Sequence, residues 1–310
     1  MISVNAVKIL HIEISTMCNA RCPQCPRNFN GWNDPIKLDE KNISVDVLRN
    51  ISKQFPNRTA VFCGNHGDPM MHKDVVDCAR LFKNVSIDTN GSIGRLESYR
   101  ELAKLGVHIS FNIDGLEDTN HIYRQDTIWE NIMDRAKAFI EAGGNAQWRF
   151  IVFRHNKHQV EEAKKLSKAM GFKDFVLSLQ GRDYGPIMDN EGKIINWLLP
   201  HDRDLEPYEY DIEFELGLLE KPLDLPYRKM SGQRIDCELK RQGNIYFNVD
   251  GELLPCCYHG VKQHIHPEGD TYQEQLDSFK FLEQGWGTDH CDETCYNACG
   301  MHHKYYEHEE

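Results

Sequence analysis

The 310-residue sequence has no apolar run close to the roughly 20 residues that span a bilayer. Its first fifteen residues also lack a basic region followed by an apolar stretch and a small-residue cleavage site. They are therefore predicted to form a strand and not a signal peptide. These two absences predict a cytoplasmic protein without a membrane segment.

Basic residues are in deficit, since 36 Lys and Arg stand against 48 Asp and Glu, for a net charge of −12. A polyanion binds through a broad positive surface, which this composition does not supply. Bulk nucleic-acid binding is therefore not expected. A local basic pocket that takes one flipped nucleotide or a tRNA loop stays open.

The eleven cysteines do not form a disulfide pattern, because their number is odd, the chain is long and no signal peptide is present. They fall into two groups. The first group is Cys18, Cys22 and Cys25; the second is Cys237, Cys256, Cys257, Cys291, Cys295 and Cys299, with Cys63 and Cys78 between the groups. This distribution favours metal or cluster ligation in a reducing compartment.

Short β-branched runs alternate with longer amphipathic stretches between residues 8 and 180, which is typical of repeated βα units around a parallel sheet. Ser44 is the predicted cap of one helix, and Gly171 is the predicted end of another. The predicted strands are residues 9–15, 59–64, 84–90, 107–114, 146–153 and 174–179. The fold class is therefore α/β, a partial (β/α)6 barrel similar to three quarters of a TIM barrel.

Three units are predicted along the chain. Residues 1–181 form the barrel, residues 182–231 form a linker or a substrate-facing segment, and residues 232–310 form a small C-terminal unit. The middle segment is rich in Asp, Glu, Pro and Tyr, and its two interpretations carry equal weight. In the C-terminal unit, residues 243–257 predict a β-hairpin with its turn at Asp250-Gly251.

The first group of cysteines has the spacing C-x3-C-x2-C and follows the first predicted strand. Loops that follow strands form the active face of such a barrel. Cys18, Cys22 and Cys25 can hold three irons of a 4Fe-4S cluster and leave the fourth iron without a protein ligand, which indicates catalysis. The alternative is a structural zinc site with a distant fourth ligand.

The motif, its position and the predicted barrel resemble the radical S-adenosylmethionine (SAM) superfamily. The resemblance implies that Cys18, Cys22 and Cys25 are catalytic, that the open iron chelates the amino and carboxylate groups of SAM, and that an electron releases a 5'-deoxyadenosyl radical. A reductase or a flavodoxin-type protein would donate that electron. Many members have an aromatic residue before the third cysteine, where this sequence has Gln24.

Gly67, Asp68 and Pro69 follow the second predicted strand and resemble the Gly-Glu-Pro segment that receives the SAM ammonium in the family. An ammonium needs acceptors, and glycine permits close backbone approach. Asp68 is expected to be an exposed acid at a strand tip that contributes little to the core. Taken alone, the tripeptide is more often a simple turn.

Polar residues end the third and fourth predicted strands and resemble the family's Thr-Asn-Gly and Ser-x-Asp-Gly strand ends. The resemblance implies that they bind the ribose and carboxylate of SAM, although each side chain also suits a turn or a helix cap. The candidates are Thr89, Asn90, Ser110, Asn112 and Asp114. Arg124 is a further candidate for the SAM carboxylate.

The second group of cysteines resembles the SPASM/twitch extension of radical SAM enzymes, which carries auxiliary iron-sulfur clusters. The resemblance implies a second 4Fe-4S cluster on Cys237 and Cys256, completed by two of Cys291, Cys295 and Cys299. Cys257 is expected on the opposite side of the strand from Cys256. A four-cysteine zinc site is the alternative, in which His259, His264, His266 or His290 could also take part.

The sequence therefore predicts an oxidoreductase or peptide-modifying enzyme of the radical SAM type. Its substrate is left open, with a peptide or protein as the leading class and a sugar alcohol as the second. Two rivals remain, a radical SAM methyltransferase and a non-catalytic iron-sulfur or zinc module on a barrel scaffold.

Overall fold

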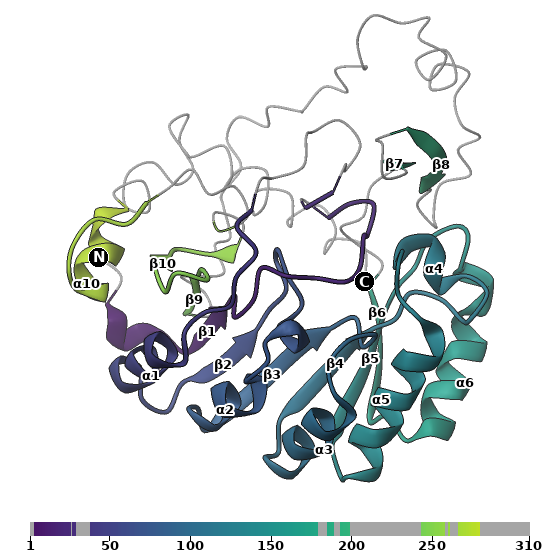
Figure 1. Cartoon of the computed structure of the whole chain (residues 1–310), viewed down its shortest axis with the longest axis horizontal. Helices are drawn as coiled ribbons and strands as arrows, with labels where there is room; N and C mark the ends of the chain where they lie inside the picture. The colour runs from purple at the N-terminus through teal and green to yellow at the C-terminus, as the bar shows by residue number, and fades with distance from the viewer. Residues whose placement is uncertain are drawn as a thin grey trace, which may run out of the picture.

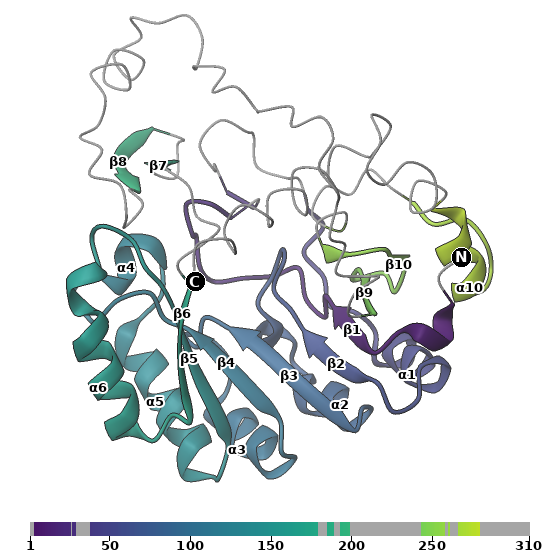
Figure 2. The ribbon, with the colours of Figure 1, turned by 180° about the vertical axis from the view of Figure 1, so that it is seen from behind.

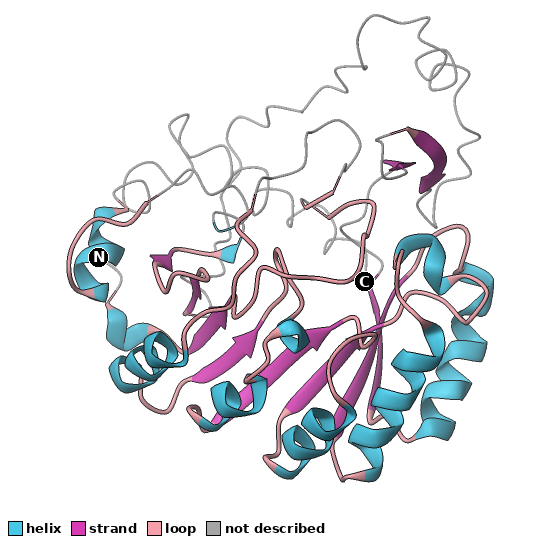
Figure 3. Cartoon of the chain, viewed as in Figure 1, coloured by secondary structure: helices cyan, strands magenta, loops and turns pink. Residues whose placement is uncertain are grey.

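The computed structural model describes residues 3–25, 27–28, 38–178, 185–188, 193–198, 243–257, 260 and 266–279. Within them, one sheet runs in the order β10-β9-β1-β2-β3-β4-β5-β6, and helices α1, α2, α3, α5 and α6 lie along one side of it (Figure 1). Strands β1 to β6 are parallel neighbours in chain order. The predicted partial α/β barrel is thus confirmed, and Figure 3 shows the same alternation of strand and helix.

The elements have the following bounds. The strands are β1 (Ile9–Ile12), β2 (Thr59–Phe62), β3 (Asn84–Thr89), β4 (His108–Asn112), β5 (Asn145–Ile151), β6 (Asp174–Ser178), β7 (Gly185–Met188), β8 (Ile194–Leu198), β9 (Asn244–Phe247) and β10 (Leu253–Leu254). The helices are α1 (Val45–Gln54), α2 (Val75–Arg80), α3 (Leu96–Lys104), α4 (Asn120–Tyr123), α5 (Trp129–Glu141), α6 (Val160–Met170) and α10 (Tyr272–Ser278), with 3-10 turns η1 (Val4–Ala6), η2 (Pro69–Met71) and η3 (Lys157–Gln159). None of these helices is long and apolar enough to cross a membrane.

Local signals in the sequence set the helix ends. The Ser44 hydroxyl accepts the Val47 N–H at 3.3 Å and caps α1, as predicted. Helix α6 ends before Gly171, whose φ of 91° is the left-handed conformation that glycine adopts without strain. The predicted strands extend beyond the observed strand ends. Beyond those ends, the backbone pairs with loop residues and no longer with a neighbouring strand, as where Ser15 pairs with Asn42.

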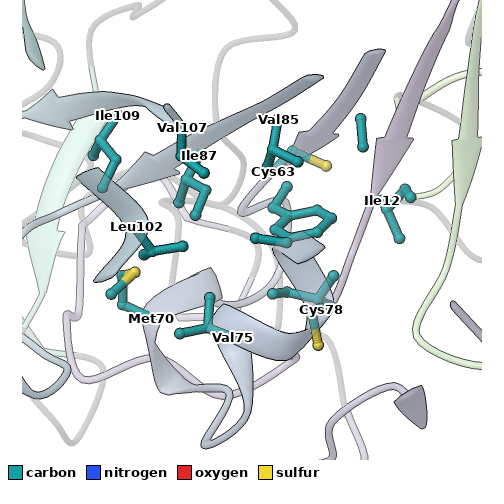
Figure 4. Close-up of a cluster of buried hydrophobic side chains, with 14 of the residues drawn as sticks. Ile12, Cys63, Met70, Val75, Cys78, Val85, Ile87, Leu102, Val107 and Ile109 are labelled. Atoms are coloured by element: carbon teal, nitrogen blue, oxygen red, sulfur yellow. The ribbon is translucent and has the colours of Figure 1, made fainter. Parts of the chain in front are cut away.

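The core lies between the sheet and the helices. Side chains alternate along each strand, so that Ala146, Trp148 and Phe150 of β5 are buried against the helices while Gln147 and Arg149 face the other way. Figure 4 shows part of this core, where strand residues Ile12, Val85, Ile87 and Ile109 meet Val75, Cys78 and Leu102 of α2 and α3. The second face of the sheet is left free for polar groups.

The predicted hairpin at residues 243–257 is present as β9 and β10, with Gly251 at a φ of 80° in its turn. Its first strand also pairs in parallel with β1, from Ile9 opposite Asn244 to Ile12 opposite Phe247. The hairpin therefore continues the main sheet and covers an edge that β1 would otherwise expose. The unit boundaries predicted at 181/182 and 231/232 involve residues outside the described ranges and stay predictions.

Candidate active site

Cys18, Cys22 and Cys25 lie in the loop that follows β1, at the carboxyl edge of the sheet. The Ala20 N–H donates to Cys18 Sγ at 3.3 Å, and the Cys25 N–H donates to the Cys22 carbonyl at 3.0 Å. The Cys22 side chain is buried, and those of Cys18 and Cys25 are half-buried. One short loop therefore offers three sulfur ligands on the face where barrel enzymes place their chemistry.

The thiols lie within each other's electrostatic field. Burial raises the pKa of Cys18, and the Asp68 carboxylate and the thiols of Cys22 and Cys25 raise it further. A thiol in such surroundings becomes a thiolate when a cation binds to it. The loop is therefore suited to a positively charged metal centre.

The donor set of this loop fits a 4Fe-4S cluster. Each of Cys18, Cys22 and Cys25 can give one thiolate to a different iron, which leaves the fourth iron without a protein ligand. In the described part of the chain, no three His, Cys, Asp or Glu side chains are arranged to hold one metal ion.

Residues 63–68 form the loop between β2 and η2, here called the Gly67 loop. Its backbone contacts the cysteine loop, which carries Cys18, Cys22 and Cys25. The Asp68 N–H donates to the Met17 carbonyl at 2.7 Å. A Cβ at Gly67 would lie 2.0 Å from the Ser15 carbonyl oxygen, so only glycine permits this approach. The predicted role of this segment depends on such closeness, because its backbone acceptors must reach a ligand of the cluster.

Asp68 is not the exposed acid that the sequence predicts. Its side chain is buried and accepts the Thr89 hydroxyl at 2.8 and 2.9 Å, the Asn90 N–H at 2.8 Å and the Met70 N–H at 2.9 Å. The expectation was wrong because β3 lies beside β2, and because Pro69 starts η2, which Asp68 caps. Asp68 therefore joins the Gly67 loop to the tip of β3, and a contact with SAM stays a prediction.

The tip of β3 also reaches the cysteine loop. Asn90 Nδ2 donates to Asn19 Oδ1 at 3.0 Å and lies 3.8 Å from Cys18 Sγ. Thr89 lies on the helix-facing side of β3, where its hydroxyl donates a hydrogen bond to Asp68. Of the two residues predicted here, Asn90 is the one that the structure brings to a cysteine sulfur.

Arg124 connects the tip of β4 to a second cysteine. Asp114 is fully buried, and its carboxylate accepts the Arg124 Nε–H at 2.7 Å and the Ile151 N–H at 2.6 Å. Arg124 Nη1 then lies 3.6 Å from Cys22 Sγ. Since N–H groups directed at sulfur tune iron-sulfur clusters, Asn90 and Arg124 are placed to act on the predicted cluster.

Ser110 and Asn112 lie along β4 on the face turned away from the helices. The Ser110 hydroxyl donates to Gln147 Oε1 at 3.2 Å, and Asn112 Nδ2 donates to the Thr89 carbonyl at 3.3 Å. These contacts place both side chains on the polar face of the sheet. Their predicted contacts with SAM stay predictions.

Glu13 is a site residue that the sequence analysis missed. Its carboxylate accepts the N–H groups of Asn65 at 3.1 Å, His66 at 3.2 Å and Gly67 at 3.0 Å, and the Tyr246 hydroxyl at 2.9 Å. Burial raises the pKa of Glu13 to about 7, although these four hydrogen bonds lower it. The Glu13 carboxylate thus fixes three consecutive N–H groups of the Gly67 loop.

A signal for Glu13 was present in the sequence. An acid stands between Ile12 and Ile14, both fully buried, in the segment that leads into the cysteine loop. A charged residue in such a position needs partners, because an unpaired carboxylate is strongly disfavoured inside a protein. What the sequence did not contain was the identity of those partners.

An apolar cluster covers one side of the cysteine loop. Ile187 of β7 and Leu198 of β8 are buried and belong to the segment predicted as linker or substrate-facing. They pack with Ala20, Cys22, Tyr123, Ile151 and Phe153, and Cys18 and Cys25 lie against the same cluster. The described part of this segment is therefore in contact with the site.

Of the cysteines predicted to bind the auxiliary cluster, only Cys256 falls within the described residues, where it is half-buried. Its neighbour Cys257 packs against the main core, and the Cys257 carbonyl accepts Asn65 Nδ2 at 3.1 Å. His266 is exposed. The other candidates lie outside the described residues, namely Cys237, Cys291, Cys295, Cys299, His259, His264 and His290.

The profile of the Radical SAM superfamily matches residues 12–177. The chain is also similar to the tungsten-containing aldehyde ferredoxin oxidoreductase cofactor-modifying protein of Pyrococcus furiosus. The two sequences are 24% identical over 266 residues, which cover 81% of this chain and 71% of that protein.

Two solved structures have a similar fold. The structure of anSMEcpe with bound AdoMet gives a TM-score of 0.58 at 18% identity and covers 89% of this chain and 82% of that one. SuiB of Streptococcus suis, bound to S-adenosylmethionine, gives 0.55 at 14% identity and covers 93% and 77%. SuiB was also solved bound to the precursor peptide SuiA.

Proposed function

This chain belongs to the radical SAM superfamily, and from that membership we propose that it cleaves SAM at a 4Fe-4S cluster held by Cys18, Cys22 and Cys25. A cluster bound there would supply one electron to the SAM sulfonium, whose C–S bond would break to give methionine and a 5'-deoxyadenosyl radical able to abstract hydrogen from the substrate. One observation carries the proposal: three cysteine thiols share a loop at the carboxyl edge of the sheet, with N–H donors of Asn90 and Arg124 directed at two of them.

The surrounding residues hold and shield the reactants. The backbone of the Gly67 loop, in contact with the cysteine loop, would receive the SAM ammonium. Asp68 acts as a positioning residue that fixes this loop to β3, and Asp114 orients Arg124. Ile187 and Leu198 would exclude water from one side of the reacting groups.

We propose a peptide or protein as the substrate. The fold is shared with SuiB, which was solved with a precursor peptide, and β7–β8 places apolar side chains beside the cysteine loop. The second candidate is a metal cofactor, which the name of the Pyrococcus furiosus relative favours. A short peptide gene beside this one would support the first, and a gene for a tungsten-containing oxidoreductase the second.

The C-terminal cysteines are proposed to hold an auxiliary 4Fe-4S cluster that assists electron flow or positions the substrate. Cys256 would be one ligand, with Cys237 and two of the three terminal cysteines completing the set. Four thiolates are the usual ligation of a cluster that does not bind substrate. A flavodoxin-type protein or a reductase would supply electrons to the enzyme.

The test is product formation after anaerobic reconstitution with iron and sulfide. The wild type under strong reductant should convert SAM to 5'-deoxyadenosine, and the Cys18→Ala, Cys22→Ala, Cys25→Ala variant should not. Cys78→Ala is the matched control, because Cys78 is buried on α2 at the helix side of the sheet. S-adenosylhomocysteine as the product would instead indicate a methyltransferase, and no SAM-derived product would indicate a non-catalytic protein.

A further inference from the structure

Glu13 stands at the meeting point of two segments that are far apart in the chain. It follows β1, and Figures 1 and 2 both show β9 directly beside β1. Its carboxylate accepts three consecutive backbone N–H groups, those of residues 65–67. The same carboxylate accepts the hydroxyl of Tyr246, 233 residues away in sequence.

The three N–H groups need a carboxylate in this place. They donate to the two carboxylate oxygens of Glu13, which is buried, so water is not available to replace Glu13 as their acceptor. A buried donor without an acceptor is destabilising, and a loop with three of them would rearrange. The conformation of residues 65–67 therefore depends on the position of the Glu13 carboxylate.

The position of Tyr246 is itself fixed by the C-terminal hairpin. Tyr246 lies opposite His11 in the β9–β1 register, and a Cβ at Gly260 would lie 2.3 Å from the Tyr246 ring. A second contact runs in parallel, since Asn65 Nδ2 donates to the Cys257 carbonyl. The hairpin thus touches the Gly67 loop through a side chain and through its backbone.

We propose that Glu13 and Tyr246, the Glu13–Tyr246 bridge, are positioning residues through which the β9–β10 hairpin sets the backbone of residues 65–67 and so the affinity for SAM. The C-terminal hairpin is then part of the SAM site, in addition to its place beside the predicted auxiliary cluster. The identity of the ligand rests on the proposed function, whereas the coupling between hairpin and loop rests on the hydrogen bonds alone.

The test compares Tyr246→Phe with Tyr272→Phe in the full chain. The first change removes only the hydroxyl that donates to Glu13. The second removes the hydroxyl of Tyr272 on α10, which bonds to Asn50 on α1, and leaves the Gly67 loop untouched. Loss of one buried hydrogen bond changes an equilibrium by up to about tenfold. Tyr246→Phe should therefore speed amide hydrogen exchange in the peptide covering residues 63–69 about tenfold and weaken SAM binding to the reconstituted protein about tenfold.

Glu13→Gln is the second variant, since a glutamine keeps the shape but its amide nitrogen cannot accept the N–H groups. Glu13→Gln should speed amide hydrogen exchange in residues 63–69 and weaken SAM binding more than Tyr246→Phe does. Unchanged exchange in Tyr246→Phe, or an equal change in Tyr272→Phe, would overturn the proposal. Accelerated exchange in a protein that makes no product from SAM would retain the bridge and reject the proposed function instead.

Discussion

Three carboxylates hold the loops at the carboxyl edge of the sheet. Glu13, Asp68 and Asp114 are each almost fully buried, and each accepts a backbone N–H from a different segment of the chain. A buried carboxylate is stable only when such donors surround it. These residues therefore determine the shape of the site before any ligand binds.

Asp68→Ala should lower the free energy of unfolding by about 3 kcal/mol, because three buried donors lose their acceptor. Urea unfolding of the cluster-free chain measures this change. Asp46→Ala is the control, since Asp46 is exposed on α1 and pairs with the exposed Arg49 of the same helix, and its removal should change stability by less than about 0.5 kcal/mol. Equal effects of the two substitutions would contradict the structural role of Asp68.

His155 should make stability depend on pH. Burial, followed by the charges of His121 and His158, lowers its pKa to about 4. The unfolded chain binds a proton near pH 6.5 and the folded chain only near pH 4, so the folded state loses stability as the pH falls through this window.

The loss reaches at most about 3 kcal/mol between pH 7 and pH 4. His155→Gln removes this titration, so the advantage of the wild type over the variant should shrink steadily as the pH is lowered. Urea unfolding of both proteins at pH 7, 5.5 and 4.5 measures it. A difference that stays constant with pH would show that His155 titrates normally in the folded chain.

At the scale of elements, the features set by neighbouring residues in the sequence were predicted correctly. Alternating runs predicted six strands, Ser44 and Gly171 predicted helix ends, and the turn at Asp250-Gly251 predicted a hairpin. The edge at which that hairpin joins the sheet was not predicted, because a pairing across more than 200 residues leaves no local pattern. The β7–β8 hairpin was missed for a different reason, since it lies where the apolar alternation fades.

The candidate site divides in the same way. Cysteine spacing, together with the position after the first predicted strand, predicted the loop with Cys18, Cys22 and Cys25, because these candidate ligands are close in sequence. The burial of Asp68 and the role of Glu13 were not predicted, because both depend on groups that neighbouring strands bring to them. Side chains whose partners come from distant segments need the fold before their role can be inferred.

Strand β9, which lies between β1 and β10, should be essential to stability. Phe247 is fully buried and contacts Phe55 and Tyr272 at ring distances of 5.6 and 5.2 Å. Phe247→Ala should therefore lower the free energy of unfolding by about 3 to 5 kcal/mol. Val176→Ala is the matched control at the opposite edge of the sheet, where the side chain is 38% exposed and about 1 kcal/mol or less is expected. Similar losses would show that β9 does not stabilise the sheet.

At the scale of the whole molecule, the two groups of cysteines should bind iron independently. The reconstituted wild type should hold about eight irons per chain, as two 4Fe-4S clusters. Cys237→Ala with Cys256→Ala should lower this to about four and retain some SAM cleavage, because the first cluster has separate ligands. Metal analysis and absorption spectra measure both proteins. About four irons with one tightly held zinc in the wild type would make the C-terminal site structural.

The pairing of β9 with β1 also orders events during synthesis. The cysteine loop ends at Cys25 and is translated more than 200 residues before Phe247, which ends the strand that completes its side of the sheet. Until that strand leaves the ribosome, β1 is an unpaired edge and Glu13 lacks the Tyr246 hydroxyl. Contacts between distant segments form late in folding, because a long loop must close first. The nascent chain therefore presents its cluster ligands long before it can close the sheet around them.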